Sequence, residues 1–375
     1  MKKKGNKFQS PGQALKYFLE EKNWTQEDLS YILSISLKHT NEMVKDKKSI
    51  SIEIARLLEN VFSWSAQEWM SLSTTYQLRS GFDNEKSELV KKRAEFAQYM
   101  PLNELIKKGW LNKYETKEQL EKQIRKFWGI PTNEEIDLSF LGQKVNNLRY
   151  KTSEAYNDRF NSYHAIIWAQ MAHNYAQRMQ VSPFNKQGLI ELMDSMHTYT
   201  KSPNGIKRFI GDLSSVGVKF VFLSHLSKTY LDGAAFLSED GPVVALTGRY
   251  DRIDNFWFTL AHELSHVVLH LTNGKSKFIF VDDTTKKGNS EAEEEANKLA
   301  EKSLLQREIF EYFNDFLNYI TEDKVIDFSN TYKLHPAIVV GILAFNDVVS
   351  YSNLQRFKEP VRNRIPSKYR VEDLK

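Results

Sequence analysis

The strongest constraint on the fold lies in one apolar stretch, 257-WFTLAHELSHVVLH-270, which contains the pattern H-E-x-x-H. His262 and His266 are four residues apart, so in a helix of 3.6 residues per turn their imidazoles project from one face. Two imidazoles at that spacing can bind one metal ion. Glu263 lies one step round the helix, in the position of the general base of metalloproteases. The stretch therefore predicts a helix that carries a metal centre.

A buried helix with two hydrogen-bonded histidines could contain the same five letters by chance. The flanking residues argue against this alternative, because 256-FWFTL-260 and 267-VVL-269 are largely apolar. Imidazoles and a carboxylate cost free energy in such surroundings unless they are paired or bind a metal. The chain of 375 residues contains no cysteine, so every metal ligand must be His, Asp or Glu. The same absence fits a reducing cytoplasm, where we expect the protein to reside.

A catalytic metal site needs a third protein ligand, and an acidic segment thirty residues downstream can supply it. The segment 290-SEAEEEANKLAEKSLL-305 predicts a helix with Ser290 as its cap. The alternative is a solvated acidic first turn that stabilises the helix dipole. Chemistry alone leaves four glutamates open as the ligand: Glu291, Glu293, Glu294 and Glu295.

Around this helix the hydrophobic pattern alternates between short strands and helices. It predicts a helix over 205–218, strands over 218–223, 233–239 and 242–247, and later helices near 290–305, 307–318 and 336–346. The last of these lies in an apolar run that is too short to span a membrane. The start of the chain is basic but is not followed by the apolar segment of a secretory signal. We expect a mostly helical α+β protein with a small sheet and no contact with a membrane.

The first 80 residues predict a bundle of five short helices with a helix-turn-helix arrangement. Thr25 with Asp28 forms a capping box, and Ser51 and Ser65 cap the fourth and fifth helices. The net charge of +4 does not by itself indicate nucleic-acid binding, although four lysines cluster among residues 1–7. If the third helix enters a DNA major groove, the contacting residues are Lys38, His39, Asn41, Lys45, Lys47 and Lys48. The alternative is a plain helical bundle that serves as a dimer or partner platform.

Residues 11–33 and 51–78 together resemble the HigA-type antitoxins of the XRE helix-turn-helix family. The shared features are Pro11-Gly12, Thr25-Gln26, Ala55 with Leu57, and the segment from Trp69 to Tyr76. This chain departs from the family pattern at four positions, where it has Ser30, Ser34, Thr40 and Asp46. The family's glycines stand at two of these positions, 34 and 46. The resemblance implies binding to the protein's own operator DNA, and such modules often form homodimers.

The segments 233-GAAFL-237, 256–270 and 293–305 are similar to the ImmA/IrrE family of metallopeptidases. The resemblance places the third metal ligand at Glu293, with Asn297 one turn later as a supporting group. It also covers 335-HPAIVVGIL-343, where Ile342 replaces the usual arginine. His335 would then stabilise an oxyanion, and the alternative is a histidine that only begins a helix before Pro336. On the metal helix, His270 follows His266 by four residues, and we expect it to support the site rather than to bind the metal.

Residues 81–200 carry helical patterns without a catalytic motif, and the spacing of His164 and His173 is poor for metal binding. We therefore predict four parts: a HigA-like helix-turn-helix domain over 1–80, a helical connector over 81–200, a gluzincin-like metallopeptidase domain over 201–355, and a tail over 356–375.

The two resemblances imply a DNA-binding regulator whose zinc-dependent endopeptidase domain cleaves a specific protein, such as a repressor or a toxin-system partner. The ligand set also suits manganese. The alternative is a HigA-type antitoxin or repressor that does not cleave, and whose C-terminal domain binds a partner or senses a metal. An intact Glu263 favours the peptidase, because a metal sensor does not need a general base.

Overall fold

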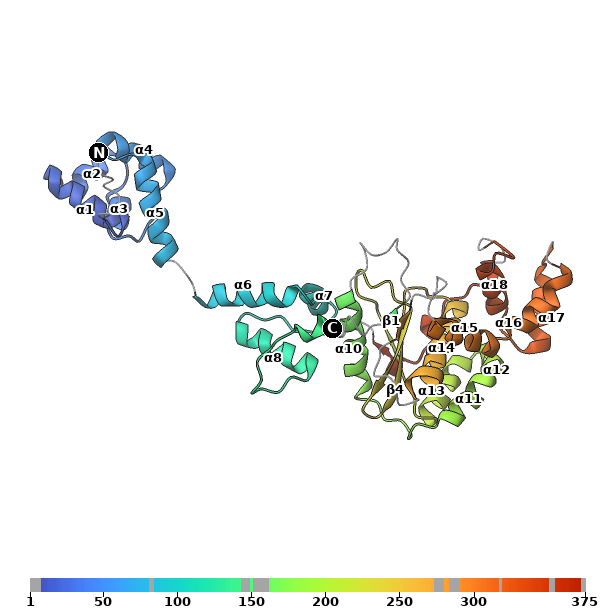
Figure 1. Ribbon diagram of the computed structural model, residues 1–375. Helices are drawn as coiled ribbons and strands as arrows, with labels where there is room; N and C mark the ends of the chain where they lie inside the picture. Colours follow the sequence, from blue (N-terminus) through green and yellow to red (C-terminus); the bar gives the residue numbers. More distant parts are fainter. Residues whose placement is uncertain are drawn as a thin grey trace. The chain divides into compact units, whose positions relative to one another are not determined.

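The computed structural model of the chain describes residues 8–80, 84–142, 149–150, 162–272, 280–282, 291–316, 319–350 and 355–371. The lysine cluster in residues 1–7 and the expected cap Ser290 lie outside these residues. Contacts divide the chain into two compact units, residues 1–91 and 92–375 (Figure 1). The four-part division remains a prediction. Within the described segments, no helix has both the length and the apolar character needed to cross a membrane.

The first unit is helical, and its elements begin where the sequence places capping residues. The predicted capping box is confirmed, because Thr25 and Asp28 exchange both hydrogen bonds. Ser51 and Ser65 accept hydrogen bonds from the backbone three residues on, as predicted. The unit's helices are α1 (Pro11–Lys22), α2 (Gln26–Ile32), α3 (Leu37–Val44), α4 (Ile52–Val61), α5 (Ala66–Ser80) and the first part of α6 (Asn84–Ala97).

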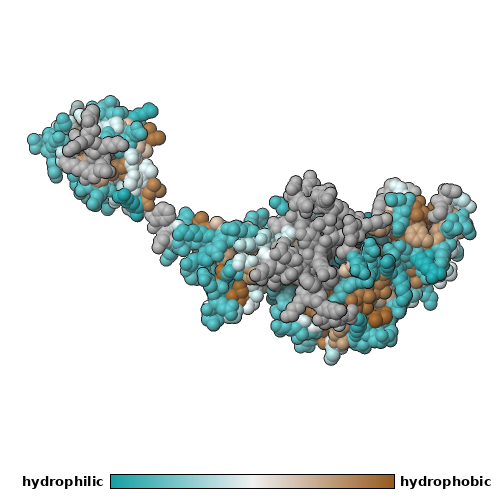
Figure 2. Space-filling view, viewed as in Figure 1, coloured by the Kyte–Doolittle hydropathy of each residue, from teal (hydrophilic) through white to brown (hydrophobic). Residues whose placement is uncertain are grey.

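The core of this unit is rich in aromatic side chains. Phe18, Phe62 and Trp69 lie within ring-contact distance of one another, and each is at most 4% exposed. Among the described residues on the face of the unit seen in Figure 2, hydrophilic side chains predominate, with a few hydrophobic ones between them. Burial of these rings stabilises the bundle, since each aromatic side chain removes a large apolar area from water.

Two turn residues of this unit adopt the left-handed conformation that glycine prefers. Ser34 has φ 53° and Asp46 has φ 56°, and these are the two positions at which the expected antitoxin pattern would have glycine. Asp46 makes two hydrogen bonds that a glycine could not make. Its carboxylate accepts one from the Ser10 hydroxyl at 2.5 Å and one from the Gly12 amide at 2.6 Å. At position 12, a Cβ would lie 2.5 Å from the carbonyl oxygen of Val44, so only glycine fits this approach of α1 to α3.

The second unit is built on a mixed sheet flanked by helices. Its strand order is β1-β5-β3-β4-β2-β6, and the predicted strands near 218, 233 and 242 are confirmed as β2, β3 and β4. β2 is parallel to β4, whereas β3 is antiparallel to both β4 and β5. The strands are β1 (Arg149–Tyr150), β2 (Lys219–Leu223), β3 (Gly233–Ser238), β4 (Gly241–Thr247), β5 (Phe280–Asp282) and β6 (Arg370–Val371).

The helices of the second unit cover both faces of this sheet. Figure 1 shows α10 on one face and α13 and α14 on the other. The predicted mostly helical α+β class is confirmed. After α6 the α-helices are α7 (Leu102–Lys107), α8 (Lys117–Trp128), α10 (Ser162–Ala176), α11 (Lys186–Asp194), α12 (Met196–Thr200), α13 (Gly205–Ser215), α14 (Ile253–His266), α15 (Glu291–Ser303), α16 (Gln306–Phe313), α17 (Glu322–Tyr332) and α18 (Pro336–Phe345).

The helix that carries H-E-x-x-H is the central helix of the second unit. Most residues of α14 are buried, including the polar residues of the H-E-x-x-H motif. Trp257 is 0% exposed, and its ring centroid lies 5.3 Å from that of Phe209 on α13. One expectation is corrected, because the α-helix does not continue to residue 270. A π-helix, η3 (Val267–Leu271), follows it, and such wider turns often occur at functional sites.

Candidate metal centre

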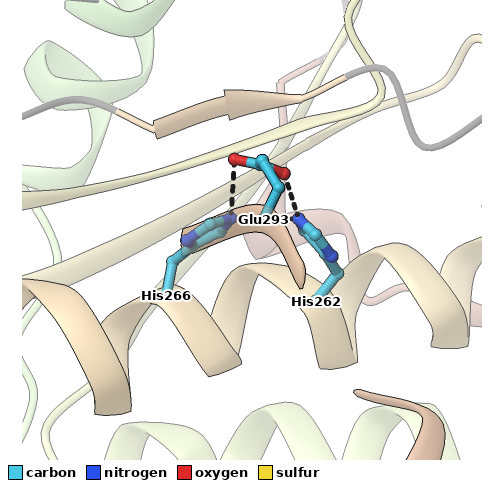
Figure 3. Close-up of side chains that lie close together, drawn as sticks. All are labelled: His262, His266 and Glu293. Atoms are coloured by element: carbon cyan, nitrogen blue, oxygen red, sulfur yellow. Dashed lines mark hydrogen bonds and ion pairs between the residues drawn. The ribbon is translucent and has the colours of Figure 1, made fainter. Parts of the chain in front are cut away.

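The structure brings together three residues that can bind one metal ion, His262, His266 and Glu293 (Figure 3). The two histidines come from adjacent turns of α14, and Glu293 comes from the first turn of α15. The two Nε2 atoms are 3.0 Å apart. The Glu293 carboxylate lies 3.3 Å from Nε2 of His262 and 3.5 Å from Nε2 of His266. The sequence pattern predicted that His262 and His266 project from one face of the helix, and the fold brings Glu293 to that face.

These distances fit a metal ion with a tetrahedral arrangement of ligands. Zinc binds imidazole nitrogen at about 2.0–2.1 Å and carboxylate oxygen at about 2.0–2.2 Å, which places neighbouring tetrahedral ligand atoms about 3.3 Å apart. The two Nε2 atoms are 3.0 Å apart, and the two oxygens of Glu293 each lie near one of them, Oε2 at 3.3 Å from His262 and Oε1 at 3.5 Å from His266, so each separation is close to that value. The three ligands leave a fourth position for water or substrate, as in catalytic sites. The nitrogen and oxygen donors also suit manganese.

Burial separates Glu293 from the other glutamates of α15. Glu293 is 4% exposed, whereas Glu291, Glu294 and Glu295 are exposed to solvent. Burial acts to raise the pKa of Glu293, but hydrogen bonds and charge from His262 and His266 outweigh it and hold the pKa below its usual range. This shift favours the ionised carboxylate, which is the state that binds a cation.

Glu263 lies against the first residue of the neighbouring strand. It is 0% exposed, and α14 packs on β3 at this point. A Cβ at position 233 would lie 2.5 Å from Oε1 of Glu263 and 2.9 Å from Cγ2 of Thr259. Gly233 thus leaves the space that the carboxylate fills. In the sequence, only the glycine that begins the segment 233–237 pointed to a space beside the Glu263 carboxylate.

We expect Gly233→Ala to lower kcat of any hydrolysis at this site by about 100-fold, because displacement of a catalytic group by about 1 Å can cost that much. The closest contact is with the end of the Glu263 side chain, and Cγ of Glu263 and Cγ2 of Thr259 follow at 2.9 Å, so a melting curve and the metal content must show that the variant is folded and loaded. The measurement is kcat together with metal affinity. Gly211→Ala is the matched control, because a Cβ there meets nothing within 4 Å. An unchanged kcat in Gly233→Ala would contradict this role for the glycine.

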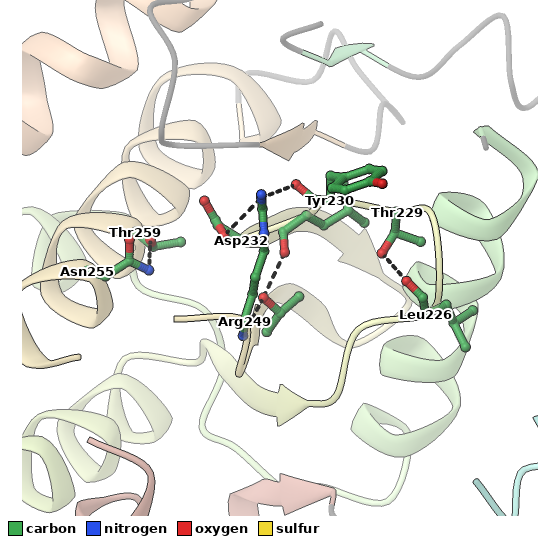
Figure 4. Close-up of polar contacts among 9 residues, drawn as sticks. Leu226, Thr229, Tyr230, Asp232, Arg249, Asn255 and Thr259 are labelled. Carbon is green, nitrogen blue, oxygen red and sulfur yellow. Dashed lines mark hydrogen bonds and ion pairs between the residues drawn. The ribbon is translucent and has the colours of Figure 1, made fainter. Parts of the chain in front are cut away.

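An ion pair between half-buried Arg249 and buried Asp232 holds the segment before Gly233 in place (Figure 4). Arg249 donates a hydrogen bond to the Tyr230 carbonyl at 2.8 Å and lies 3.7 Å from the carboxylate of Asp232. The Thr247 hydroxyl donates to the Leu231 carbonyl at 2.7 Å. These contacts fix the turn that enters β3 and hence the backbone that faces Glu263. No motif in the sequence indicated this network, because it joins residues from two separate loops.

His270 ties the metal helix to the helix that supplies the glutamate. Its Nε2 lies 3.0 Å from the carbonyl oxygen of Ala292, which directly precedes Glu293. Its ring centroid is 5.2 Å from that of His266, and its Nδ1 lies 3.9 Å from the carboxylate of Glu295. This placement agrees with a supporting role, which remains a prediction.

We expect His270→Ala to weaken metal binding by about 10-fold, the lower end of the effect of groups that orient metal ligands. The loss follows from a freer first turn of α15 and hence a less well positioned Glu293. Competition with a chelator of known affinity measures the change. His270→Gln keeps a donor and should recover part of the affinity. Equal affinities for the wild type and His270→Ala would rule out the positioning role.

The other two residues expected to support the site, Asn297 and His335, are not part of the metal group. Asn297 is half-buried one turn after Glu293, and no hydrogen bond to the metal group is recorded among the described residues. His335 begins α18, where its Nδ1 accepts a hydrogen bond from the Ala337 amide, and its Nε2 lies 3.9 Å from Glu359. Burial lowers the pKa of His335, which favours a neutral ring. The structure thus shows the helix-start histidine, and both proposed supporting roles remain predictions.

The expected DNA-contacting residues lie on or just after α3 in the first unit. Four of them are exposed: Lys38, Lys45, Lys47 and Lys48. His39 and Asn41 are half-buried, and Thr40 is fully buried in the core. The lysines are therefore available for phosphate contacts, whereas Asn41 offers only part of its side chain.

A family model described as the IrrE N-terminal-like domain, Peptidase_M78, matches residues 214–337. The matched segment contains β2 to β4, all of α14 and the three residues of the metal group. This part of the chain is thus similar to a peptidase family, as the sequence motifs predicted. The match does not include the first 80 residues, so their resemblance to antitoxins remains a prediction. No curated protein matches the chain.

Proposed function

We propose that the protein is a zinc-dependent endopeptidase that cleaves a specific regulatory protein, with an N-terminal unit that binds DNA. The observation that carries the enzymatic part is the buried group of His262, His266 and Glu293 beside Glu263, within a segment that matches a peptidase family. Manganese is the second metal that the ligand set accommodates. A metal sensor would need the ligands but not the adjacent carboxylate.

In the proposed reaction each residue has a distinct task. His262, His266 and Glu293 would hold the ion, which when bound lowers the pKa of a water molecule and polarises the scissile carbonyl. Glu263 accepts the proton of the attacking water and passes it to the leaving amine. Gly233 leaves the space for that carboxylate, and the Arg249–Asp232 pair lies in the turn that leads to Gly233.

The test of peptidase activity uses a peptide mixture made from total cellular protein. The zinc-loaded chain is incubated with the mixture, and new termini are sequenced by mass spectrometry. We expect a restricted set of cleavages that a chelator abolishes and added zinc restores. Metal binding without any cleavage would favour the alternative, a repressor or antitoxin whose C-terminal domain senses metal or binds a partner.

For the N-terminal unit we expect Lys38→Ala with Asn41→Ala to weaken binding to the promoter of the protein's own gene, since both residues lie on α3. Replacement of Lys45, Lys47 and Lys48 by Ala should reduce the slope of log K against log salt by about 0.9 for each lost phosphate contact. Fluorescence anisotropy with a labelled duplex measures both effects. Lys16→Ala on α1 is the control. Promoter affinity that is unchanged in both sets of variants would refute the assignment of α3.

A further inference from the structure

A cavity of about 350 Å³ lies in the second unit, between the first two turns of α14 and the helix α18. This volume falls in the range of pockets that bind small organic groups. Its apolar wall is formed by Phe258, Ile338, Gly341, Ile342 and Phe345. Phe258 and Phe345 are only half-buried, and their ring centroids are 6.2 Å apart. Apolar surface therefore faces the cavity, and an apolar group that covered it would bind favourably.

The cavity begins one helical turn from the metal group. Phe258 precedes His262 by four residues, so the two side chains project from the same face of α14. Their rings are stacked, with centroids 6.5 Å apart and an interplanar angle of 26°. Four residues of helix span about 6 Å, which is the length of about two residues of an extended peptide. A peptide held at the metal group could thus place a neighbouring side chain in the cavity.

The charged groups of the cavity neutralise each other. The Nε atom of Arg252 donates a hydrogen bond to Asp254 at 3.0 Å, and Asp254 is only 7% exposed. Because the two charges are paired, the cavity offers no surplus charge to an acidic or basic side chain, which would lose its hydration without compensation. Asn255 and Gln306 contribute amide groups to the lining, and these can hydrogen-bond to a peptide backbone.

Helix α18 reaches the cavity because of a close contact with α14. A Cβ at position 341 would lie 2.8 Å from Oδ2 and 2.9 Å from Cβ of Asp254. Gly341 therefore allows the approach, and its successor Ile342 contributes to the wall. Ile342 lines the cavity and is 5% exposed, so a larger side chain at this position would extend into the cavity.

We propose that this cavity is the specificity pocket of the peptidase and that it binds one large, uncharged apolar side chain of the substrate, such as Leu, Ile, Met or Phe. The bound residue lies within about two residues of the scissile bond. This inference rests on the proposed peptidase function and extends it by naming the substrate class.

The test compares cleavage preferences of the wild type and a variant with a filled pocket. Digestion of the peptide mixture by the wild type should show Leu, Ile, Met or Phe enriched about 10-fold or more over Ala at one position near the cleaved bond. Ile342→Trp should shift that preference to Ala, Gly or Ser. The control is Ile52→Trp, the same change at a position that is 64% exposed in the first unit. Melting curves establish that each variant is folded.

A second variant, Phe345→Ala, tests the pocket independently if Ile342→Trp does not fold. Phe345→Ala enlarges the cavity and should shift the preference toward Trp, Tyr and Phe. A preference that is absent in the wild type, or that neither folded variant changes, would overturn the pocket assignment even if cleavage itself occurs.

A binding measurement separates failure of the pocket from failure of the peptidase function. N-acetyl-leucinamide and N-acetyl-alaninamide are titrated into the full chain, and methyl resonances of Ile338 and Ile342 are followed by NMR. Binding of the leucine compound in the absence of any cleavage would support the pocket and contradict the peptidase. If neither compound perturbs these methyl groups, the pocket assignment is wrong.

Discussion

Glu263→Gln should reduce the kcat of peptide hydrolysis by about 10²–10⁴-fold, the contribution of a well-placed general base. Glutamine has nearly the same shape as glutamate but cannot accept the proton of the attacking water. Glu263 is 0% exposed and lies against Gly233, so a side chain of equal size preserves the packing. Metal affinity should stay close to the wild-type value, because the three ligands are unchanged.

The matched control for this variant is Glu301→Gln, a change on α15 at a position that is only half-buried. Both variants are assayed on the same peptide mixture, with zinc content measured by atomic absorption. Full hydrolysis by a zinc-loaded Glu263→Gln protein would refute the mechanism. Retained biological regulation by the same variant would favour the non-proteolytic repressor.

Glu293→Gln should remove most of the stabilisation that zinc gives to the fold. Ligand binding stabilises a protein by RT ln(1 + [L]/Kd), which is about 4.1 kcal/mol at a zinc concentration of 1,000 Kd. Loss of the only anionic ligand should weaken binding by about 100-fold or more, since even groups outside the ligand set contribute 10–100-fold. At the same zinc concentration, the stabilisation of the fold by zinc then falls to about 1.4 kcal/mol.

Melting curves with and without zinc measure this effect without any knowledge of the substrate. Glu294→Gln is the matched control, because Glu294 is the next residue on α15 but is exposed. Its zinc-dependent stabilisation should equal that of the wild type. If Glu294→Gln loses the stabilisation and Glu293→Gln keeps it, the ligand assignment is wrong.

The variants Glu263→Gln and Glu293→Gln together distinguish a loss of catalysis from a loss of metal binding. Glu263→Gln separates chemistry from metal binding, whereas Glu293→Gln removes metal binding and hence chemistry with it. A protein that loses activity in both variants but loses zinc only in the second behaves as a metallopeptidase. A protein whose regulation fails only in the second behaves as a metal-dependent binding protein.

Local patterns predicted several features well. The spacing of His262 and His266 placed two imidazoles on one helical face, and helical periodicity needs only neighbouring residues. The capping box at Thr25 follows equally from local hydrogen bonds. The helix predicted near 336–346 is present as α18 (Pro336–Phe345), and most of its residues are buried. By contrast, the predicted α-helix through residue 270 missed the π-helix after His266, because such a turn has no local sequence signal.

The sequence by itself thus determined the helix that carries the metal ligands, the strands beside it and the short list of glutamates that could complete the site. The family resemblance named Glu293 among these glutamates, and only the tertiary structure showed that this residue is buried against the histidines, that Gly233 borders Glu263, and that α14 and α18 enclose a cavity. The physical reason is that side-chain periodicity follows from the backbone of one segment. Burial and close approach depend instead on how segments far apart in the chain pack against one another.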